Sequence, residues 1–333
     1  MPWLLLTISG MVLIVLSADY FTNGVEWLGY YLHLEEGAMG SLLAALGTAL
    51  PETLVPVVAI IFSPLHSQTA IGLGAILGAP LMLATIGFAV IGLGLRMRSR
   101  SKTSLNVPTV GTMSKDLGFF LLAFGLALIT TFLPAMIHPV MLAVLLTLYV
   151  VHAWRLVRGN QKPEGVPGPS LPSQPLRLSA TPRKRSWLAI VQVLLALIGL
   201  ILGAHFFVTA LDTVTKFFPI SPFLLAVIVT PVATELPEVL NSVIWIRRGK
   251  DTLAVGNVTG AMAFQSSIVP ALGIGFTPWA LTPLEIATGV LTWLAACWIW
   301  LKSRSQHLYT TELLTAGLFY VIYIAIVASL YTS

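Results

Sequence analysis

Two stretches of this sequence share the pattern Thr-x-Leu-Pro-Glu: Gly47-Thr48-Ala49-Leu50-Pro51-Glu52 and Ala233-Thr234-Glu235-Leu236-Pro237-Glu238. The similarity extends upstream at a constant offset of 186 residues, where Ala18-Asp19-Tyr20-Phe21 aligns with Ala204-His205-Phe206-Phe207. Downstream, after a loop four residues shorter, Gly72-Leu73-Gly74-Ala75-Ile76-Leu77-Gly78-Ala79 resembles Ala254-Val255-Gly256-Asn257-Val258-Thr259-Gly260-Ala261. The chain therefore consists of two related halves.

The composition is that of an integral membrane protein. Of the 333 residues, 56% are hydrophobic and only 9% are charged, and the mean hydropathy is +0.89. A soluble domain carries about 25% charged residues, so this chain cannot build an ordinary water-exposed surface. The single cysteine, Cys297, excludes a disulfide framework and a cysteine metal site. The net charge of +5 does not indicate a nucleic-acid partner, because the basic residues lie between apolar runs.

Ten apolar runs are long enough to cross a bilayer, which takes about 20 residues in a helix. They lie at about 3–21, 38–62, 69–95, 117–133, 139–157, 187–210, 220–246, 252–275, 279–301 and 309–331. Between the fifth and sixth runs, segment 158–186 is rich in Pro, Gly, Ser and basic residues, and we predict an aqueous linker there. The predicted fold is all-α, with a first half over 1–157 and a second over 187–333.

The basic residues predict the orientation, because cytoplasmic loops collect Lys and Arg. With the N-terminus outside, the inside loops hold 17 of the 18 basic residues, and Lys216 alone lies outside. Both termini are then outside, and the linker is cytoplasmic in a cell (inner) membrane. Because each half has an odd number of spans, the halves enter the membrane in opposite senses. This is the inverted repeat of many secondary transporters.

The repeated motif predicts a cation site. A carboxylate inside a spanning helix costs at least about 2.5–3.5 kcal/mol on insertion and is usually retained for function. Here it follows a proline in both halves, and proline leaves backbone carbonyls without a donor. Carbonyl, hydroxyl and carboxylate oxygens are the ligands that Ca²⁺ prefers. The two half-sites would meet near the midplane and suit Ca²⁺ or Na⁺.

At these residues the sequence resembles the Ca²⁺/cation antiporter superfamily, which includes the sodium/calcium exchangers. That family carries two inverted repeats with a Gly-Thr-Ser-Leu-Pro-Glu type motif, followed by a Gly-Asn-x-x-Gly-Ser-Asn type motif on the next helix. The resemblance implies a secondary antiporter, not an enzyme, that exports Ca²⁺ in exchange for Na⁺ or H⁺ by alternating access and needs no cofactor. It implies Glu52 and Glu238 as central Ca²⁺ ligands, with oxygen ligands from Thr48 and Thr234, and it matches Asn257 to the family's asparagine.

The sequence departs from the family pattern at several polar positions. The serine of the motif is Ala49 in the first half and Glu235 in the second, one asparagine is Ala75, and another aligns with Gln265. Side-chain oxygens expected at sodium sites are therefore missing, which leaves Na⁺ and H⁺ open as coupling ions. Glu235 lies three residues before Glu238, near the same helical face, so it joins the predicted cation ligands. Gln265 joins them because it aligns with a family asparagine.

Three other functions are compatible with the same features. A Na⁺/H⁺ exchanger without a Ca²⁺ step would use the same carboxylates. An intramembrane enzyme with paired acids and a transport-inactive scaffold are further alternatives, although no serine–histidine or paired-aspartate motif accompanies the glutamates. Asp19 and His205 occupy matching positions and predict either a proton relay or packing. The expected partners are the lipid bilayer and the transported cations, with no nucleic acid; the oligomeric state is left open.

Overall fold

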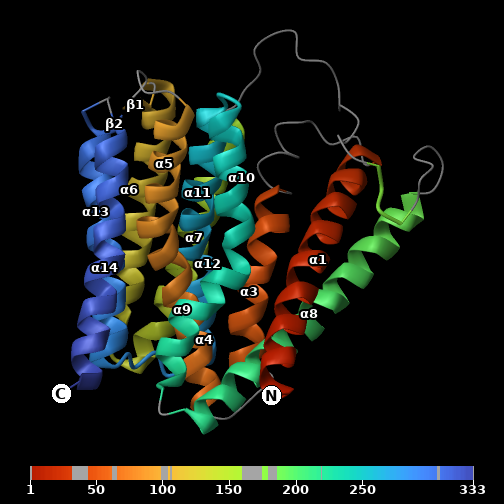
Figure 1. The fold of residues 1–333 in the computed structure, drawn as a ribbon, viewed down its shortest axis with the longest axis vertical. Coiled ribbons are helices and arrows are strands. Elements are labelled where there is room, and N and C mark those ends of the chain that lie inside the picture. The colour runs from red at the N-terminus through yellow and green to blue at the C-terminus, as the bar shows by residue number, and fades with distance from the viewer. Residues whose placement is uncertain are drawn as a thin grey trace.

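The structure, a computed structural model, is built from helices that run between the two ends of one bundle (Figure 1). It describes residues 2–31, 44–61, 66–98, 104–105, 107–159, 175–178, 186–218, 220–305 and 308–332. The helices are α1 (Pro2–Tyr31), α3 (Ala44–Ile61), α4 (His66–Met82), the π-helix η2 (Leu83–Gly87), α5 (Phe88–Arg98), α6 (Val107–Thr130), the 3₁₀ turn η3 (Ala135–Ile137), α7 (His138–Gly159), α8 (Ser186–Phe217), α9 (Pro222–Thr234), α10 (Leu236–Arg247), α11 (Asp251–Gln265), α12 (Ile268–Phe276), α13 (Pro283–Ser303) and α14 (Thr310–Thr332). Strands β1 (Ser104–Leu105) and β2 (Leu308–Tyr309) pair antiparallel.

The helices confirm the predicted set of about ten spans. Within the described ranges, eight helical segments are long and apolar enough to cross a membrane, and the bent pair α9–α10 makes nine. Helix α3 occupies the remaining predicted position, the second span of the first half.

The two halves repeat the same order of elements. The first half runs α1, α3, α4–η2–α5, α6 and α7, and the second runs α8, α9–α10, α11–α12, α13 and α14. Helices of one half pack on those of the other: α1 on α8, α4 on α9, and α5 on α14. Helix α1 begins at the end of the bundle where α14 finishes, whereas α8 begins at the opposite end (Figure 1). The halves are therefore inverted, as predicted.

Helices α1 and α8 are longer than the sequence predicted. They have 30 and 32 residues, or about 45 Å at 1.5 Å per residue, against a hydrocarbon core of about 30 Å. Such helices must tilt, and Figure 1 shows both crossing the bundle obliquely. The predicted ends at 21 and 210 were wrong, because packing between the two helices continues the helical structure past the apolar runs. Glu26, five residues beyond the end of the first apolar run, lies on α1 with an exposed side chain.

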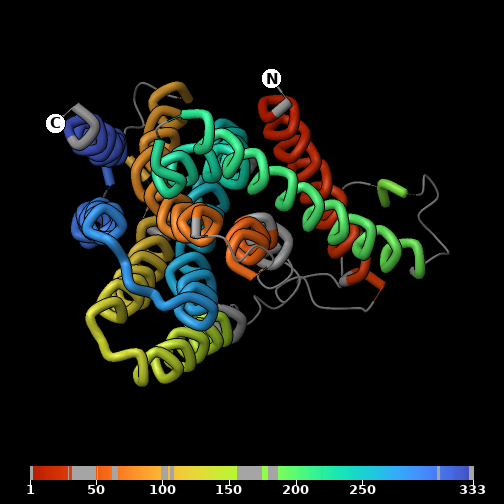
Figure 2. The backbone as a smooth tube through the Cα atoms, turned by 90° about the horizontal axis from the view of Figure 1, so that it is seen from below, coloured from red at the N-terminus to blue at the C-terminus, as the bar shows by residue number. Residues whose placement is uncertain are grey.

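Glycines let the backbones of α1 and α8 touch. A Cβ atom at Gly10 would lie 2.8 Å from the backbone nitrogen of Phe207, and one at Gly203 would lie 3.0 Å from that of Ile14. Any larger residue at these positions would push the helices apart. The pair lies at one edge of the bundle, where it packs against α3, α4 and α9 (Figure 2).

The third span of each half departs from α-helical geometry at the same place. In the first half the departure is η2, where Thr85 donates from its hydroxyl to the carbonyl of Leu81. In the second half, Ser266 and Ser267 separate α11 from α12. The downstream repeat aligns 72–79 with 254–261, so residues 83–87 correspond to 265–269. The α-helix of this span is therefore interrupted at equivalent positions in the two halves, and in the second half the interruption begins next to Gln265.

Part of the predicted linker contacts the α1–α8 pair. Most of 158–186 lies outside the described residues, but Leu176 is buried beside Trp27. The side chain of Asn23 donates to the carbonyl of Pro175, and Gln192 donates to both Asn23 and the carbonyl of Tyr20. The described part of the linker, residues 175–178, thus packs against both long helices.

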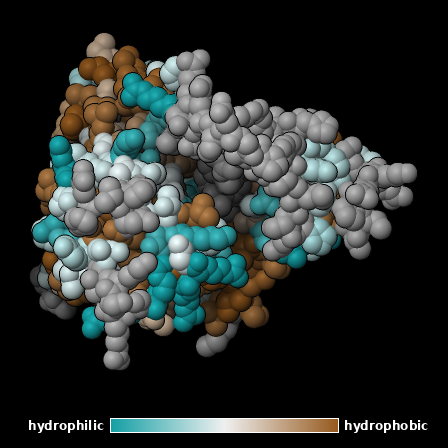
Figure 3. All heavy atoms as spheres, turned by 90° about the horizontal axis from the view of Figure 1, so that it is seen from above, coloured by the Kyte–Doolittle hydropathy of each residue, from teal (hydrophilic) through white to brown (hydrophobic). Residues whose placement is uncertain are grey.

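The outer surface fits a lipid environment. Large apolar side chains face outward on several helices, for example Leu5 on α1 at 72% exposure and Val321 on α14 at 63%. Seen from above, hydrophilic residues gather over the ends of the helices, whereas hydrophobic residues cover the sides (Figure 3).

Candidate cation site

The motif of the second half lies at a break in its helix. Helix α9 ends at Thr234, α10 begins at Leu236, and the two segments are bent by 46°. Glu235 is the residue between them. Pro231 and Pro237 have no N–H group, so each removes a donor from the carbonyl one turn earlier. The two prolines therefore leave the carbonyls of Val227 and Ala233, both on the α9 side of the break, without the N–H donor that a regular helix would supply.

A glutamine side chain joins the two halves at this break. Nε2 of Gln265 lies 2.5 Å from Oε2 of Glu52 and 3.0 Å from Oε1 of Glu235, and it donates to both. All three side chains are at most 3% exposed. Glu52 comes from α3 and the other two from the second half. Three of the predicted ligands therefore meet as one hydrogen-bonded cluster.

Thr234 of α9 contacts the same cluster, and Thr230 lies one turn before it. The hydroxyl of Thr234 lies 3.2 Å from Oε1 of Glu235 and 3.3 Å from the carbonyl of Thr230. Thr230 itself is 2% exposed, and its hydroxyl has no hydrogen-bond partner. Sequence reasoning missed Thr230, although it lies one turn before Thr234 and just before Pro231. That spacing was the available signal.

Five buried oxygen atoms of these side chains make no hydrogen bond. They are Oε1 of Glu52, Oε2 of Glu235, Oε2 of Glu238, Oε1 of Gln265 and Oγ1 of Thr230. An unsatisfied buried polar group costs about 1–3 kcal/mol, and more when it is charged. A set made only of oxygens, with carboxylates among them, is the chemistry that hard cations such as Ca²⁺ or Na⁺ require.

Glu238 belongs to the site's surroundings more loosely than Glu52 and Glu235. It lies in the first turn of α10, and it is 5% exposed. Among the residues that the structure describes, no three acidic, histidine or cysteine side chains are arranged as a ready metal-binding group. The close pair is Glu52 with Glu235, and Glu238 supplies a third buried carboxylate beside it.

The other predicted ligands are placed as follows. The amide nitrogen of Asn257 lies 3.2 Å from the carbonyl oxygen of Glu238 and 3.4 Å from Oγ of Ser242. Ser242 donates to the same carbonyl at 2.9 Å. Asn257 therefore holds the backbone of α10, and its ligand role stays a prediction. Thr48 lies in α3, but its side chain falls outside the described set.

Asp19 and His205, the matching pair of the repeat, both lie on exposed faces of the long helices. Asp19 forms an ion pair of 3.1 Å with Arg177 of the linker. His205 contacts the ring of Phe206. Their proton-relay role stays a prediction.

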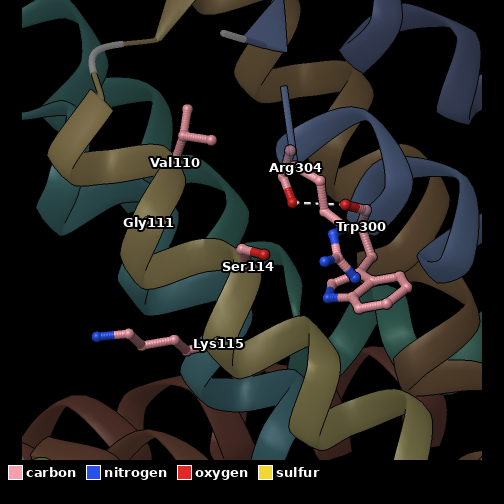
Figure 4. A pocket seen from close by; sticks show the side chains of 7 residues that line it. Val110, Gly111, Ser114, Lys115, Trp300 and Arg304 are labelled. Atoms are coloured by element: carbon pink, nitrogen blue, oxygen red, sulfur yellow. Dashed lines mark hydrogen bonds between the residues drawn. The ribbon is translucent and has the colours of Figure 1, made fainter. Parts of the chain in front are cut away.

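A cavity of about 370 Å³ opens between α6 and α13, and none of its lining residues belongs to the cluster of glutamates. Figure 4 shows Arg304 beside the indole of Trp300 on one wall, with Ser114 and Lys115 on the other. The guanidinium carbon of Arg304 lies 5.1 Å from the ring centre of Trp300. The cavity is thus separate from the candidate cation site.

Known proteins resemble this chain in sequence or in fold. The inner membrane protein YrbG of Escherichia coli is 26% identical over 293 residues, covering 84% of this chain and 81% of that protein. A crystal structure of the H⁺/Ca²⁺ exchanger CAX has a TM-score of 0.75 at 15% identity, covering 98% of this chain and 82% of that one. A structure of the sodium-calcium exchanger NCX_Mj has a TM-score of 0.58 at 20% identity, covering 97% of both chains. These two likenesses show the shared fold.

The sequence comparison extends over both halves. The family described as sodium/calcium exchanger protein matches residues 2–157 and 188–332. These ranges include both copies of the Thr-x-Leu-Pro-Glu motif and the cluster around Gln265. The chain is a multi-pass membrane protein of the sodium/calcium exchanger family.

Proposed function

We propose that this protein is a secondary antiporter that exports Ca²⁺ in exchange for H⁺ or Na⁺ by alternating access. The observation that carries the proposal is the buried cluster in which Gln265 joins Glu52 of one half to Glu235 of the other. An inverted repeat with its site between the halves is the arrangement that alternating access uses. The two proteins of similar fold, the H⁺/Ca²⁺ exchanger CAX and the sodium-calcium exchanger NCX_Mj, are both calcium exchangers, which supports the same cargo.

The geometry favours protons as competitors at this site. Glu52 and Glu235 both contact one amide nitrogen, so their charges lie close together in a medium of low dielectric. Two ionised carboxylates in this position repel each other, and a cation or a proton relieves the repulsion. Either Na⁺ or H⁺ could therefore drive the exchange, and the proposed activity is transport, not an enzymatic reaction. The proposed cation ligands are Glu52, Glu235, Glu238, Thr234 and Gln265.

Flux into proteoliposomes tests the proposal. Gradients of Ca²⁺, Na⁺ and pH are imposed independently, and Ca²⁺ movement is followed together with internal pH. Ca²⁺ flux driven by a pH or Na⁺ gradient supports the proposal and identifies the coupling ion. Sodium-dependent proton movement without Ca²⁺ flux would instead identify a Na⁺/H⁺ exchanger. Neither flux would leave the scaffold or enzyme alternatives.

A matched control separates the site from buried glutamates in general. Glu285 is also only 5% exposed, but it closes the capping box at the start of α13 with Thr282. Glutamine serves equally well at that position of a capping box. Glu285→Gln is therefore expected to transport like the unmodified protein, whereas Glu52→Gln is expected to be inactive.

We further propose the domain division and orientation given by the basic residues: halves 1–157 and 187–333, a cytoplasmic linker 158–186, and outside termini. Ser305 and Ala280 lie in exposed turns after α13 and before it. After replacement of Cys297, a cysteine at Ser305 should react only with reagent inside, and one at Ala280 only with reagent outside. The opposite labelling pattern would reverse the topology.

A further inference from the structure

A second buried polar cluster lies outside the cation site, between α6, α7 and α11. Thr259 of α11 donates its hydroxyl to Oδ2 of Asp116 on α6 at 2.7 Å. The other carboxylate oxygen, Oδ1, lies 3.6 Å from Nε2 of His152 on α7. The imidazole ring stacks on Phe119, with ring centres 4.1 Å apart and planes inclined by 18°. Three helices thus place one acid and one base face to face.

The facing atoms of this Asp116–His152 pair have no other partner. Oδ1 of Asp116 and Nε2 of His152 are both shielded from solvent and make no hydrogen bond. Asp116 is 4% exposed and Thr259 is fully buried. A carboxylate oxygen accepts and an imidazole N–H donates, so the two atoms suit each other when Nε2 carries a hydrogen. Neutral imidazole holds one hydrogen, on either ring nitrogen, and a second one makes the ring a cation beside the carboxylate.

The other charged groups on the helices around the pair are exposed, are paired elsewhere or lie at a helix end. On α6, Lys115 is exposed, and on α7 Arg155 is exposed one turn beyond His152. Tyr149 of α7 packs against Phe264 of α11. At the N-terminus of α11, Asp251 is paired with Arg98. Helix α13, which also packs on α6, has its basic residues, Lys302 and Arg304, in its last turn and cap, and its buried acid, Glu285, in its first turn.

We propose that Asp116 and His152 together form a protonation site that is distinct from the glutamate cluster and takes one proton between them. In the protonated form both ring nitrogens of His152 carry a hydrogen, and the N–H at Nε2 faces Oδ1 of Asp116, while Thr259 continues to hold Oδ2. With the proton the pair is neutral overall, and without it the pair carries one negative charge. This inference concerns proton binding and holds whichever cation the antiporter carries.

The site is connected to the cation cluster through one helix. Thr259 lies six residues before Gln265 on α11, or about 9 Å along the axis. The pair also lies in the part of the bundle where α6 begins and α7 ends, toward the end predicted to face the cytoplasm. A proton from that side would change the charge beside the helix that carries Gln265.

Histidine NMR tests the proposal directly. The chain has six histidines, so the protein is labelled with ¹⁵N in the imidazole rings and placed in lipid nanodiscs, and His152 is assigned from the spectrum of His152→Gln. The pH is varied from about 5 to 9, the range in which histidines change charge. We expect His152 to follow one transition in this range, and Asp116→Asn to displace that transition by at least about one pH unit toward acid, because the carboxylate that holds the proton is gone.

Two further variants keep the result interpretable. Thr259→Val retains both titrating groups but removes the donor to Oδ2, so it should displace the transition toward alkaline pH. Asp251→Asn removes a carboxylate on the same helix that is paired elsewhere, and it should leave the transition in place. The proposal is overturned if His152 shows no transition, or if Asp116→Asn leaves it unchanged. Should Asp116→Asn fail to fold, an unchanged transition in Thr259→Val overturns the proposal.

Discussion

Replacing Glu235 by glutamine removes one charge from the candidate cation site and almost nothing else. Oε2 of Glu52 and Oε1 of Glu235 lie 2.5 and 3.0 Å from the same nitrogen, so these oxygens cannot be more than 5.5 Å apart. At about 5 Å and an effective dielectric constant of about 20, two unit charges repel by about 3 kcal/mol. This energy corresponds to about two pH units, at 1.36 kcal/mol per unit. Glutamine is preferred to serine because the position is fully buried and a shorter side chain would leave a void.

The expected result is a changed pH profile of Ca²⁺ transport. In the unmodified protein, repulsion between the carboxylates favours proton binding and therefore opposes Ca²⁺ at low pH. In Glu235→Gln, Ca²⁺ uptake should persist to lower pH, with the midpoint of the profile displaced by about one to two units. The apparent affinity for Ca²⁺ at alkaline pH should fall, because one ligand has lost its charge. Uptake is measured in proteoliposomes from about pH 5.5 to 9, without Na⁺.

Two controls define the refutation. Glu285→Gln carries the same chemical change at a buried glutamate in a capping box and should reproduce the unmodified profile. Glu52→Gln should abolish uptake at every pH. If the profiles of Glu235→Gln and the unmodified protein superimpose while both controls behave as described, Glu235 contributes no charge to the site and the reasoning is wrong.

Three further predictions concern other parts of the structure. Glu238→Gln should remove most Ca²⁺ transport while the protein stays folded. The loss should not add to that of Glu52→Gln, because either change alone leaves an incomplete site. Size-exclusion profiles check the folding and ⁴⁵Ca flux checks the transport, and normal flux would contradict the prediction. Gln265→Leu removes the donor shared by two buried carboxylates, and each hydrogen bond to a charged group contributes about 1.5–3 kcal/mol to stability. The melting temperature measured without cations should therefore fall by several degrees, and added Ca²⁺ should restore part of that loss. Thr282→Ala removes the N-cap of α13 and should cost about 1 kcal/mol of stability without changing the pH profile of transport, which denaturant unfolding and flux assays measure together.

The fold could be predicted from the sequence because two strong signals agree. The apolar runs mark the spans, and the repeated motif relates the halves, so the inverted arrangement follows from counting. The ends of α1 and α8 could not be predicted in this way. Hydropathy reports where a chain can contact lipid, whereas these helices continue through contacts with each other, as Trp27 shows by packing in one buried cluster with Ala189 of α8.

The sequence predicted which residues form the candidate site better than it predicted how they are arranged. The duplicated Leu-Pro-Glu marks Glu52 and Glu238, but the structure pairs Glu52 with Glu235 through Gln265, a residue 213 positions away. Side-chain contacts between distant segments depend on rotamers and helix rotation, which local patterns do not contain. Asp116 gave no signal in the sequence for a related reason: it is one acid near the start of an apolar run, and its partners come from two other helices.

The interruption of both third spans shows where the two halves stop being equivalent. In the alignment that relates these spans, Gln265 corresponds to Leu83, which is fully buried and offers no polar group. The upstream alignment likewise sets Glu235 against Ala49. An inverted repeat with identical halves would present the same ligands to both sides of the membrane. Here the amide and the extra carboxylate come from one half only, so we expect the outward-open and inward-open forms to bind the same ion with unequal affinity, and the exchanger to have a preferred side for loading Ca²⁺.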